Sequence, residues 1–415
     1  MTPPIRLLLA LLLVAPAASA QFCPLSAGET VRRIVSCEPG VAMAECSAAA
    51  RTAGCSVVRE LASINAVVIE VPLGRVSFAE NRLATNSAVR RVDPSPVKNW
   101  IRETRGLPAF GAVDTAAFKF VRAAEAATGP SDAAADPEQP WGVQRVKAAL
   151  AWPRTQGRGV KVAVIDTGVQ KDNPELAGIL RGGFNALANG RPDDWGDEEG
   201  HGTHVAGTIA AKRDGEGVVG VAPQVELYSV RVLDKDGNGT YDDVIAGIEW
   251  AAANGMQVAN LSLGADEGSE PLRLAVQAAA RRGLVIVAAT GNSGGPVNYP
   301  AKYPETIAVG ASDRDDKTAF FSSRGSEVDF IAPGMDIPSL KKGGGTETLS
   351  GTSMATPHVT GLAALAIASG ARDARAALVA AASKLPGSAD EDQGNGLPTA
   401  ERLRRNGDDL LASLR

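Results

Sequence analysis

Three short segments of the chain carry side chains that together could perform nucleophilic chemistry. The segment VIDTG contains Asp166, the segment GHGTHVAGT contains His201, and the segment GTSMATPHVTG contains Ser353. A serine hydroxyl is a poor nucleophile at neutral pH. It needs a base with a pKa near 7, and that base needs a group that fixes its tautomer and stabilises its cation. Serine, histidine and aspartate meet these needs, so the three segments predict acyl-transfer chemistry.

The nucleophile is expected at the start of a helix. Gly351 and Thr352 lead into Ser353, and sequence rich in Ala and Leu follows to about Ser369. The N-terminus of a helix gathers unpaired backbone N–H groups and positive potential, which favour both a serine oxygen and an oxyanion formed beside it. The alternative is that Ser353 only caps the helix, as serines often do. Its role therefore depends on the other two segments.

The region around these segments alternates between apolar runs and helical stretches. Buried parallel strands read as continuous apolar runs, and we expect strands at 160–165, 225–232, 258–262, 284–289 and 306–309. Helices are expected between them, for example at 241–254 and 270–282. This pattern predicts an α/β fold, a doubly wound parallel sheet with helices on both faces. Sites in such sheets lie at the carboxyl ends of the strands. Asp166 and Ser262 each stand at the end of an expected strand, and Asn292 follows another.

Length, charge and the N-terminus indicate an exported chain with more than one domain. A length of 415 residues suggests two or three domains, and the net charge of −5 includes no basic block that would suit nucleic acid. Residues 1–20 have the form of a signal peptide, with Arg6, an apolar run at 7–14 and a small-residue cleavage site ending at Ala20. That run is too short to span a bilayer. We therefore expect export to a periplasm or to the medium, with no membrane span.

The cysteines lie together near the N-terminus. All four follow the expected signal peptide within a short window: Cys23, Cys37, Cys46 and Cys55. An even number of cysteines in an exported chain predicts two disulfides, with three possible connectivities. A zinc site is the alternative, but the spacing contains no C-x-x-C pair and no histidine is near. The rest of the chain has no cysteine, so its chemistry is not thiol chemistry.

Residues 21–100 are expected to form a small α+β domain. Strands are expected at 30–36, 56–71 and 89–92, and helices at 42–53 and 77–86, in the order β-α-β-α-β. Residues 101–138 read as a linker and processing region, because their last part is polar and rich in Pro, Gly and Asp. Residues 139–400 contain the three segments, and residues 401–415 read as a charged tail.

Residues from about 141 to 400 resemble the subtilisin-like serine proteases, or subtilases. The resemblance rests on the three motifs in the order Asp, His, Ser, and on GVAP at 220–223, GIEWA at 247–251 and FSSRG at 321–325. It implies a serine endopeptidase in which Asp166 orients the imidazole, His201 is the general base and Ser353 is the nucleophile. His204 and His358 are expected to pack in the core.

The resemblance also implies how substrate binds. The side-chain amide of Asn292 would stabilise the oxyanion together with the backbone N–H of Ser353. Two edge segments, 237–239 and 262–264, would hold a polypeptide as an added strand. The first pocket would be small and uncharged, which favours broad specificity for apolar or medium-sized residues. The implied substrate-binding residues are Gly237, Gly239, Tyr241, Ser262, Leu263, Gly264, Ala289 and Asn298.

Two structural Ca²⁺ sites are implied in the same way, since hard oxygen ligands suit calcium. The first would combine Glu175 with Asp214 and the carbonyls of the loop 212–218, and the second would use Glu327 and Asp329. The alternative for both is a solvated acidic surface. The stretch DKDGNG at 234–239 begins like an EF-hand loop, but Ile245 stands where that loop needs its bidentate Glu, which excludes an EF-hand.

The stretch from SINAVVIEV to AVRRVDPSPV resembles the inhibitory propeptide of this family. It implies a monomeric zymogen that cuts itself between Val97 and Gln139 and is inhibited by its own propeptide until then. A retained accessory domain is the alternative for this region. For the whole chain, the alternatives are an inactive scaffold or chaperone with this fold, and acyl transfer to an amine, as in peptide ligation.

Overall fold

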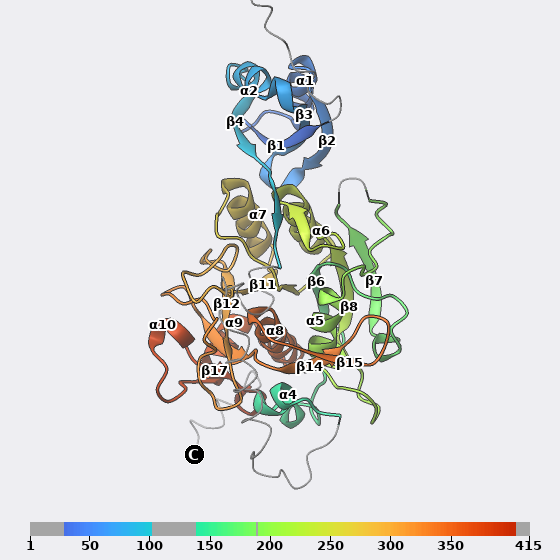
Figure 1. The fold of residues 1–415 in the computed structure, drawn as a ribbon, viewed down its shortest axis with the longest axis vertical. Helices are drawn as coiled ribbons and strands as arrows, with labels where there is room; N and C mark the ends of the chain where they lie inside the picture. The colour runs from blue at the N-terminus through green and yellow to red at the C-terminus, as the bar shows by residue number, and fades with distance from the viewer. Residues whose placement is uncertain (1–28, 102–137, 188–189, 404–415) are drawn as a thin grey trace, which may run out of the picture.

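The structure is a computed structural model that describes residues 29–101, 138–187 and 190–403 (Figure 1). Four predicted features lie wholly or largely outside the described residues: the signal peptide 1–20, Cys23, the linker 101–138 except for its two end residues, and the tail beyond Leu403. Within the described part of the chain, no helix has the length and apolar character needed to cross a membrane.

Residues 30–94 form a small N-terminal unit. Its four strands make an antiparallel sheet in the order β2-β3-β1-β4, and two helices, α1 and α2, pack on one face of that sheet. The side chains of β3 alternate: Val67 and Ile69 face the helices, whereas Ala66 and Val68 face the rest of the molecule. The elements are β1 (Thr30–Cys37), α1 (Met43–Thr52), β2 (Ser56–Leu61), β3 (Ala66–Pro72), α2 (Val76–Ala84) and β4 (Val89–Pro94).

The single strand expected at 56–71 is wrong, because two strands occupy this stretch. A 3₁₀ turn at Ala62–Ile64 and Asn65, whose φ of 48° lies in the left-handed region, reverse the chain between β2 and β3. Asparagine is among the residues that most readily adopt this conformation. The unit therefore has the β-α-β-β-α-β order of a split βαβ fold, and not the expected β-α-β-α-β order.

A seven-stranded parallel sheet forms the centre of the large unit, residues 138–403. The strand order is β13-β12-β11-β10-β6-β8-β7, and every neighbouring pair is parallel. This sheet confirms the predicted doubly wound α/β architecture. Its strands are β6 (Lys161–Asp166), β7 (Leu180–Asn185), β8 (Glu226–Arg231), β10 (Val258–Leu261), β11 (Val285–Ala289), β12 (Thr306–Ser312) and β13 (Phe330–Pro333).

Helices cover both faces of the large sheet (Figure 1). The side chains of β6 divide between two apolar clusters: Val162 and Val164 pack with α5, α8 and α9, and Ala163 and Ile165 pack with α6 and α7. Both faces are therefore buried, as parallel sheets require. The helices are α4 (Trp141–Arg145), α5 (His201–Ala210), α6 (Tyr241–Ala253), α7 (Glu270–Arg281), α8 (Thr352–Ala368), α9 (Ala374–Ala381) and α10 (Asp390–Gln393).

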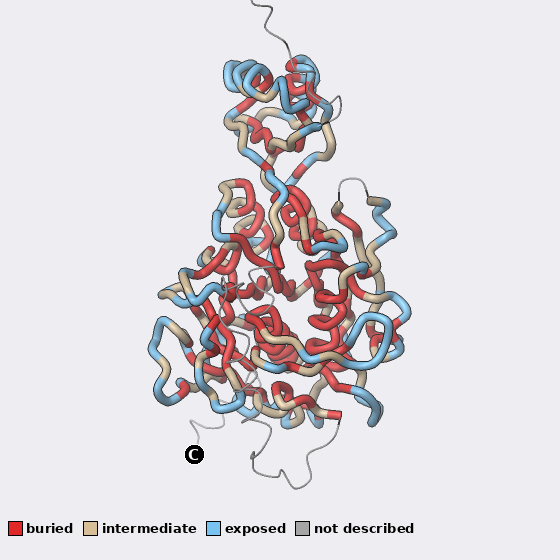
Figure 2. The backbone as a smooth tube through the Cα atoms, viewed as in Figure 1, coloured by how far each residue is buried: buried red, intermediate tan, exposed pale blue. Residues whose placement is uncertain are grey.

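Short strand pairs complete the large unit. β14 (Ile337–Leu340) pairs with β15 (Thr346–Leu349), and β16 (Ala382–Ser383) pairs with β17 (Leu397–Pro398). Ala400 and Leu403 are buried in the core, so the chain still packs on this unit where the charged tail was expected to begin. Both units have buried centres, and much of their outer loops is exposed (Figure 2).

The two units meet at a junction above α6 and α7 (Figure 1). Ile34, Leu61 and Val68 of the N-terminal sheet share an apolar cluster with Val244 and Ile248 of α6. Beyond β4 the chain continues into β5 (Val97–Asn99), which pairs with β9 (Asn238–Thr240) of the large unit.

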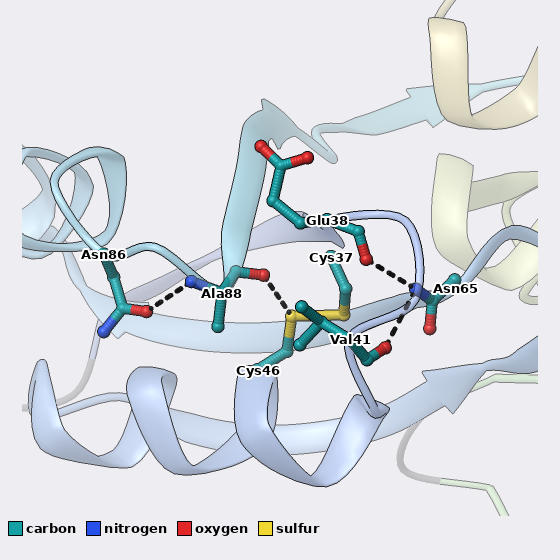
Figure 3. Close-up of a disulfide and its surroundings, with 7 residues drawn as sticks. All are labelled: Cys37, Glu38, Val41, Cys46, Asn65, Asn86 and Ala88. Atoms are coloured by element: carbon teal, nitrogen blue, oxygen red, sulfur yellow. Dashed lines mark hydrogen bonds between the residues drawn. A yellow bond between two sulfur atoms is a disulfide. The ribbon is translucent and has the colours of Figure 1, made fainter.

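One disulfide joins the described cysteines. Cys37 at the end of β1 is bonded to Cys46 in α1 (Figure 3). Cys55 is buried and forms no disulfide with another described residue. The second predicted disulfide would need Cys23, so its pairing stays a prediction.

Candidate active site

Asp166 and His201 form a buried pair at the carboxyl end of β6. Nδ1 of His201 lies 2.8 Å from Oδ1 of Asp166, and neither side chain is exposed. Because the backbone N–H of Thr167 also donates to this oxygen at 2.7 Å, the carboxylate is held in place. A carboxylate only accepts, so Nδ1 carries the proton and Nε2 is the basic nitrogen. No described residue hydrogen-bonds to Nε2, which leaves it available as a base.

The loop before α5 is fixed by the buried carboxylate of Asp197. Its two oxygens accept hydrogen bonds from the hydroxyl of Thr167 at 3.0 Å and from the hydroxyl of Thr203 at 2.6 Å. The loop after β6 is thereby tied to the start of α5. The approach is so close that a Cβ atom at Gly202 would come within 2.1 Å of a backbone carbonyl of that loop. These contacts set the position of the His201 ring.

Ser353 lies in the first turn of α8, while Gly351 holds the N-cap position. Its Oγ donates to the carbonyl of Ser262 at 2.9 Å, and Oγ of Ser262 donates to the carbonyl of Ser353 at 2.8 Å. The latter carbonyl lacks the usual helical donor, because Pro357, four residues later, has no N–H. The two serines thus join the end of β10 to the start of α8. Ser353 and His201 are not hydrogen-bonded to each other in this state.

The side-chain amide of Asn292 is oriented by Thr352. Its Oδ1 accepts from the backbone N–H of Thr352 at 2.9 Å and from the Thr352 hydroxyl at 3.0 Å. Its Nδ2 is buried and has no partner among the described residues. A buried donor without a partner, beside the residue that precedes Ser353, suits an oxyanion hole. Sequence reasoning missed Thr352, although its position next to Ser353 could have suggested a supporting role.

The two predicted substrate edges hold a segment of the chain itself. β5 runs antiparallel to β9, with Lys98 opposite Gly239. Past this pair, the backbone N–H of Trp100 donates to the carbonyl of Gly237 at 3.0 Å. The N–H of Gly264, on the other edge, donates to the carbonyl of Trp100 at 2.9 Å. Residues 97–100 therefore lie as an added strand that reaches both edges, which the sequence did not predict.

The side chain of Trp100 is anchored beside the first edge. It is fully buried, and its Nε1 donates to the carbonyl of Gly239 at 3.0 Å. Its ring meets the ring of Tyr241 edge-on, with centroids 4.9 Å apart. The Tyr241 hydroxyl donates to the carbonyl of Glu267 at 2.6 Å, and burial raises its pKa to about 12. Tyr241 therefore stays neutral and borders a space that accepts a large aromatic ring.

The remaining predicted pocket residues, Leu263, Ala289 and Asn298, are buried. Leu263 and Ala289 are fully buried. The backbone N–H of Asn298 donates to the carbonyl of Thr290 at 2.8 Å. A Cβ atom at Gly291, whose φ is +108°, would come within 2.8 Å of the Asn298 amide. Asn298 thus lies against the turn that carries Asn292.

The first predicted cation site is assembled around Glu175. Its Oε2 is buried without a partner among the described residues, and burial raises the pKa of this carboxyl. The loop 212–218 lies against it, because the N–H of Lys212 donates to the Glu175 carbonyl at 2.9 Å. Asp214 contacts Nζ of Lys212 at 2.5 Å. Within the described ranges, no three His, Cys, Asp or Glu side chains gather as a metal-binding group, so any cation here would depend on carbonyl ligands.

At the second predicted cation site, a positively charged side chain stands where the ion was expected. Nη2 of Arg375 lies 3.3 Å from Oδ2 of Asp329 and also donates to the carbonyl of Thr306. Glu327 contacts Nζ of Lys302 at 3.4 Å. Sequence reasoning missed Arg375, which lies 46 residues after Asp329.

A doubly wound parallel sheet with this Asp–His pair and this serine-bearing helix defines the class of α/β serine hydrolases. A model described as the subtilase family, Peptidase_S8, matches residues 157–396, more than half of the chain, and the chain belongs to that family, the subtilisin-like serine proteases.

Individual relatives agree with this membership. The chain is 50% identical over 228 residues to M-protease of Shouchella clausii and to Subtilisin Savinase of Lederbergia lenta, and 49% identical over 232 residues to Subtilisin E of Bacillus subtilis. The match covers 54% of this chain in each case. It covers 59% of M-protease, 83% of Subtilisin Savinase and 60% of Subtilisin E. The chain thus spans about six tenths of the length of two of these relatives.

Proposed function

We propose that the chain is a serine endopeptidase that hydrolyses polypeptides through an acyl-enzyme. The observation that carries this proposal is the buried His201, whose Nδ1 is held by Asp166 and whose Nε2 has no partner among the described residues. His358 also has a buried ring nitrogen without a described partner, but its other nitrogen meets a backbone carbonyl, whereas that of His201 meets a buried carboxylate, as a general base requires. Family membership supports the same reaction.

In the proposed reaction, Ser353 turns from the carbonyl of Ser262 towards Nε2 of His201. Its oxygen attacks the substrate carbonyl carbon while its proton passes to Nε2, and Asp166 stabilises the imidazolium that forms. The carbonyl oxygen becomes an oxyanion that accepts hydrogen bonds from Nδ2 of Asn292 and the backbone N–H of Ser353. The C–N bond then breaks, the amine leaves with the proton from Nε2, and water releases the acyl group by the same steps.

The position of residues 97–100 supports autoinhibition by the N-terminal unit. These residues pair with both edges that would hold a substrate, so a substrate strand cannot bind while they remain. We therefore propose a monomeric zymogen, exported after removal of residues 1–20, that cuts itself between Val97 and Gln139. The large unit would then be the mature enzyme.

We also propose one structural calcium ion. The unpaired buried oxygen of Glu175 beside the loop 212–218 fits a hard cation better than solvent does. Glu175 and Asp214 would hold the ion with carbonyls of that loop, and the ion would add stability without entering the reaction. A second ion at Asp329 is not needed, because the guanidinium of Arg375 already neutralises that carboxylate.

Intact mass and N-terminal sequencing of purified protein, wild type beside Ser353→Ala, test the proposal. We expect only the wild type to lose its N-terminal unit and to be labelled by a serine-directed phosphonate. If both proteins stay full length and neither is labelled, the inactive-scaffold alternative replaces the proposal. If both are cut alike, another protease does the processing. Product masses from a peptide incubated with an added amine distinguish hydrolysis from ligation.

A further inference from the structure

A compact group of charges joins the N-terminal unit to the start of α6. Arg32 in β1 and Arg59 in β2 meet the carboxylates of Asp242 and Asp243, the second and third residues of α6. The carboxylate side chains are at most 4% exposed, and the arginine side chains are 14% and 16% exposed. These ion pairs are therefore almost fully shielded from water.

The contacts are specific at the level of single atoms. Nη2 of Arg59 donates to Oδ1 of Asp243 at 2.9 Å, and its Nε lies 3.6 Å from Oδ2 of Asp242. Nη1 of Arg32 lies 3.3 Å from both carboxylates. The hydroxyl of Ser95, just after β4, donates to the other oxygen of Asp242 at 2.7 Å. Nε of Arg32 also lies 3.5 Å from Oε1 of Glu70 in β3, so two positive groups meet three negative groups, and both Asp242 oxygens are satisfied.

The two carboxylates differ in what holds them within the large unit. Asp243 also forms a capping box with Thr240, whose hydroxyl donates to it at 2.6 Å. Asp242 has side-chain partners only from the N-terminal segment among the described residues: Arg32, Arg59 and Ser95. In the large unit alone, the Asp242 carboxylate has nothing to pair with. The Asp242 carboxylate is therefore placed to pair with the arginines of the N-terminal unit.

Burial separates these pairs from the ion pairs that Lys98 makes with Asp266 and Glu267. Lys98 of β5 contacts Glu267 at 3.0 Å, but the Glu267 side chain is 72% exposed. Exposed pairs contribute little to affinity, whereas removal of one partner from a buried pair leaves a shielded charge without compensation. The four shielded groups should therefore dominate the electrostatic part of the attachment.

We propose that Arg32, Arg59, Asp242 and Asp243 form a latch that keeps the N-terminal unit seated on the large unit independently of the covalent connection. The inference rests on the proposed autoinhibition, and it adds which residues control the release. Cutting the chain would leave the latch closed and the substrate edges blocked. Activity would appear only when the latch opens or its N-terminal half is degraded.

The test uses the full-length Ser353→Ala protein, in which self-cutting cannot interfere. Hydrogen exchange followed by mass spectrometry reports how often residues 97–100 leave β9 and the edge at Gly264. We expect Arg59→Gln and Asp242→Asn each to accelerate this exchange at least tenfold. The double variant should exchange about as fast as the faster single variant, because the two residues act on one interaction. Arg82→Gln, which removes an exposed charge from α2, is the matched control and should change nothing.

Two results would overturn the latch: unchanged exchange in both single variants, or an equal acceleration in Arg82→Gln. If Arg59→Gln does not fold, Asp242→Asn on the large unit decides alone, because it keeps the shape of the side chain and removes its charge. Native mass spectrometry of processed wild type supplies the second readout, in which the cut N-terminal unit should remain bound. A wild type that is never cut contradicts the proposed function. The latch is tested separately, by the exchange rates of the Ser353→Ala variants.

Discussion

Nε2 of His201 and Nδ2 of Asn292 are buried nitrogen atoms without hydrogen-bond partners among the described residues. An unsatisfied buried polar group costs about 1–3 kcal/mol. The unpaired Nε2 of His358 belongs to the packed core, whereas the other polar atom of each of these two side chains is held by Asp166 or by Thr352, next to Ser353. One of these atoms can accept a proton and the other can donate a hydrogen bond. When a peptide bond reacts, Nε2 of His201 could therefore act as the base and Nδ2 of Asn292 could stabilise the oxyanion.

Replacing Asn292 with Ala should lower kcat and leave KM nearly unchanged, because the oxyanion that Nδ2 would bind forms only after attack. We expect a loss of about 100- to 1,000-fold, or about 3–4 kcal/mol, the size known for removal of this kind of donor in subtilisin. Steady-state kinetics on a chromogenic peptide measure it, with the variant processed by a trace of wild type. Asn254→Ala, at an exposed helix end, is the control. A rise in KM at constant kcat would instead assign Asn292 to ground-state binding.

The third histidine provides a test of the core. His358 is fully buried, its Nδ1 donates to the carbonyl of Met354 at 2.9 Å, and burial lowers its pKa to about 4. Between pH 6.5 and 4 the unfolded chain binds this proton and the folded protein does not. Stability should therefore be full above pH 6.5 and should fall by about 1.4 kcal/mol per pH unit as the pH drops through that window.

Nuclear magnetic resonance titration of Ser353→Ala measures this directly, since the chain has only three histidines. The imidazole signal of His358, assigned by its loss in His358→Gln, should not shift above pH 5. A midpoint near 6.5 would mean that the ring is hydrated and would rule out the packed-core assignment.

At the scale of elements, the strand β9 and the residues beside it would bind a substrate strand through backbone groups. Gly237 has a φ of +78°, and a Cβ atom there would come within 2.4 Å of the Ile101 side chain, which occupies the substrate edge. Gly255, at the end of α6, has a φ of +69° with nothing within 4 Å. The two glycines share backbone strain and differ only in what lies opposite.

Gly237→Ala should therefore raise KM by about tenfold with little change in kcat, since overpacking costs about 1–3 kcal/mol. Gly255→Ala should leave both constants unchanged. Both variants should lose similar stability, about 1–2 kcal/mol, from the left-handed backbone. Kinetics and thermal unfolding of both processed variants check this. Equal kinetics in the two variants would show that substrate does not follow the path of residues 97–101.

The sequence predicted those strands whose residues are continuously apolar and missed those that are not. β6, β10 and β11 were predicted to within one residue at each end, because buried parallel strands leave few positions for polar groups. β7 was missed because its sequence LRGGFN contains two glycines, and β13 because it is only four residues long and ends at Pro333.

Contacts between distant segments could not be predicted from local patterns. Asp166 and His201 were predicted to act together because catalysis needs both residue types and each lies in a recognisable sequence motif. The pairing of β5 with β9 spans about 140 residues, and the sequence VKN carries no sign of its partner. Arg375 was missed for the same reason, since only the fold brings it to Asp329.

At the scale of the whole molecule, a bound cation would stabilise the large unit by joining Glu175 to the loop 212–218. Free Ca²⁺ at 100 times its Kd should stabilise the protein by about 2.7 kcal/mol, so a chelator should lower the Tm of the wild type. Glu175→Gln should abolish this dependence. Glu327→Gln should preserve it, because Glu327 contacts Lys302 beside the site already neutralised by Arg375. Differential scanning calorimetry with and without Ca²⁺ gives the result, and a Tm of wild type that ignores chelator would reject the calcium site.

The position of the Cys37–Cys46 bond separates the thiol and disulfide chemistry of the molecule from its catalysis (Figure 3). Every cysteine precedes Ser56, in the part that the mature enzyme would discard. A reductant present while the chain folds can therefore impair the guarding unit and, through it, maturation. The same reductant added afterwards finds no bond to break in the large unit. An organism could thus expose the finished enzyme to reducing surroundings without loss of activity, while production of the enzyme stays dependent on an oxidising compartment.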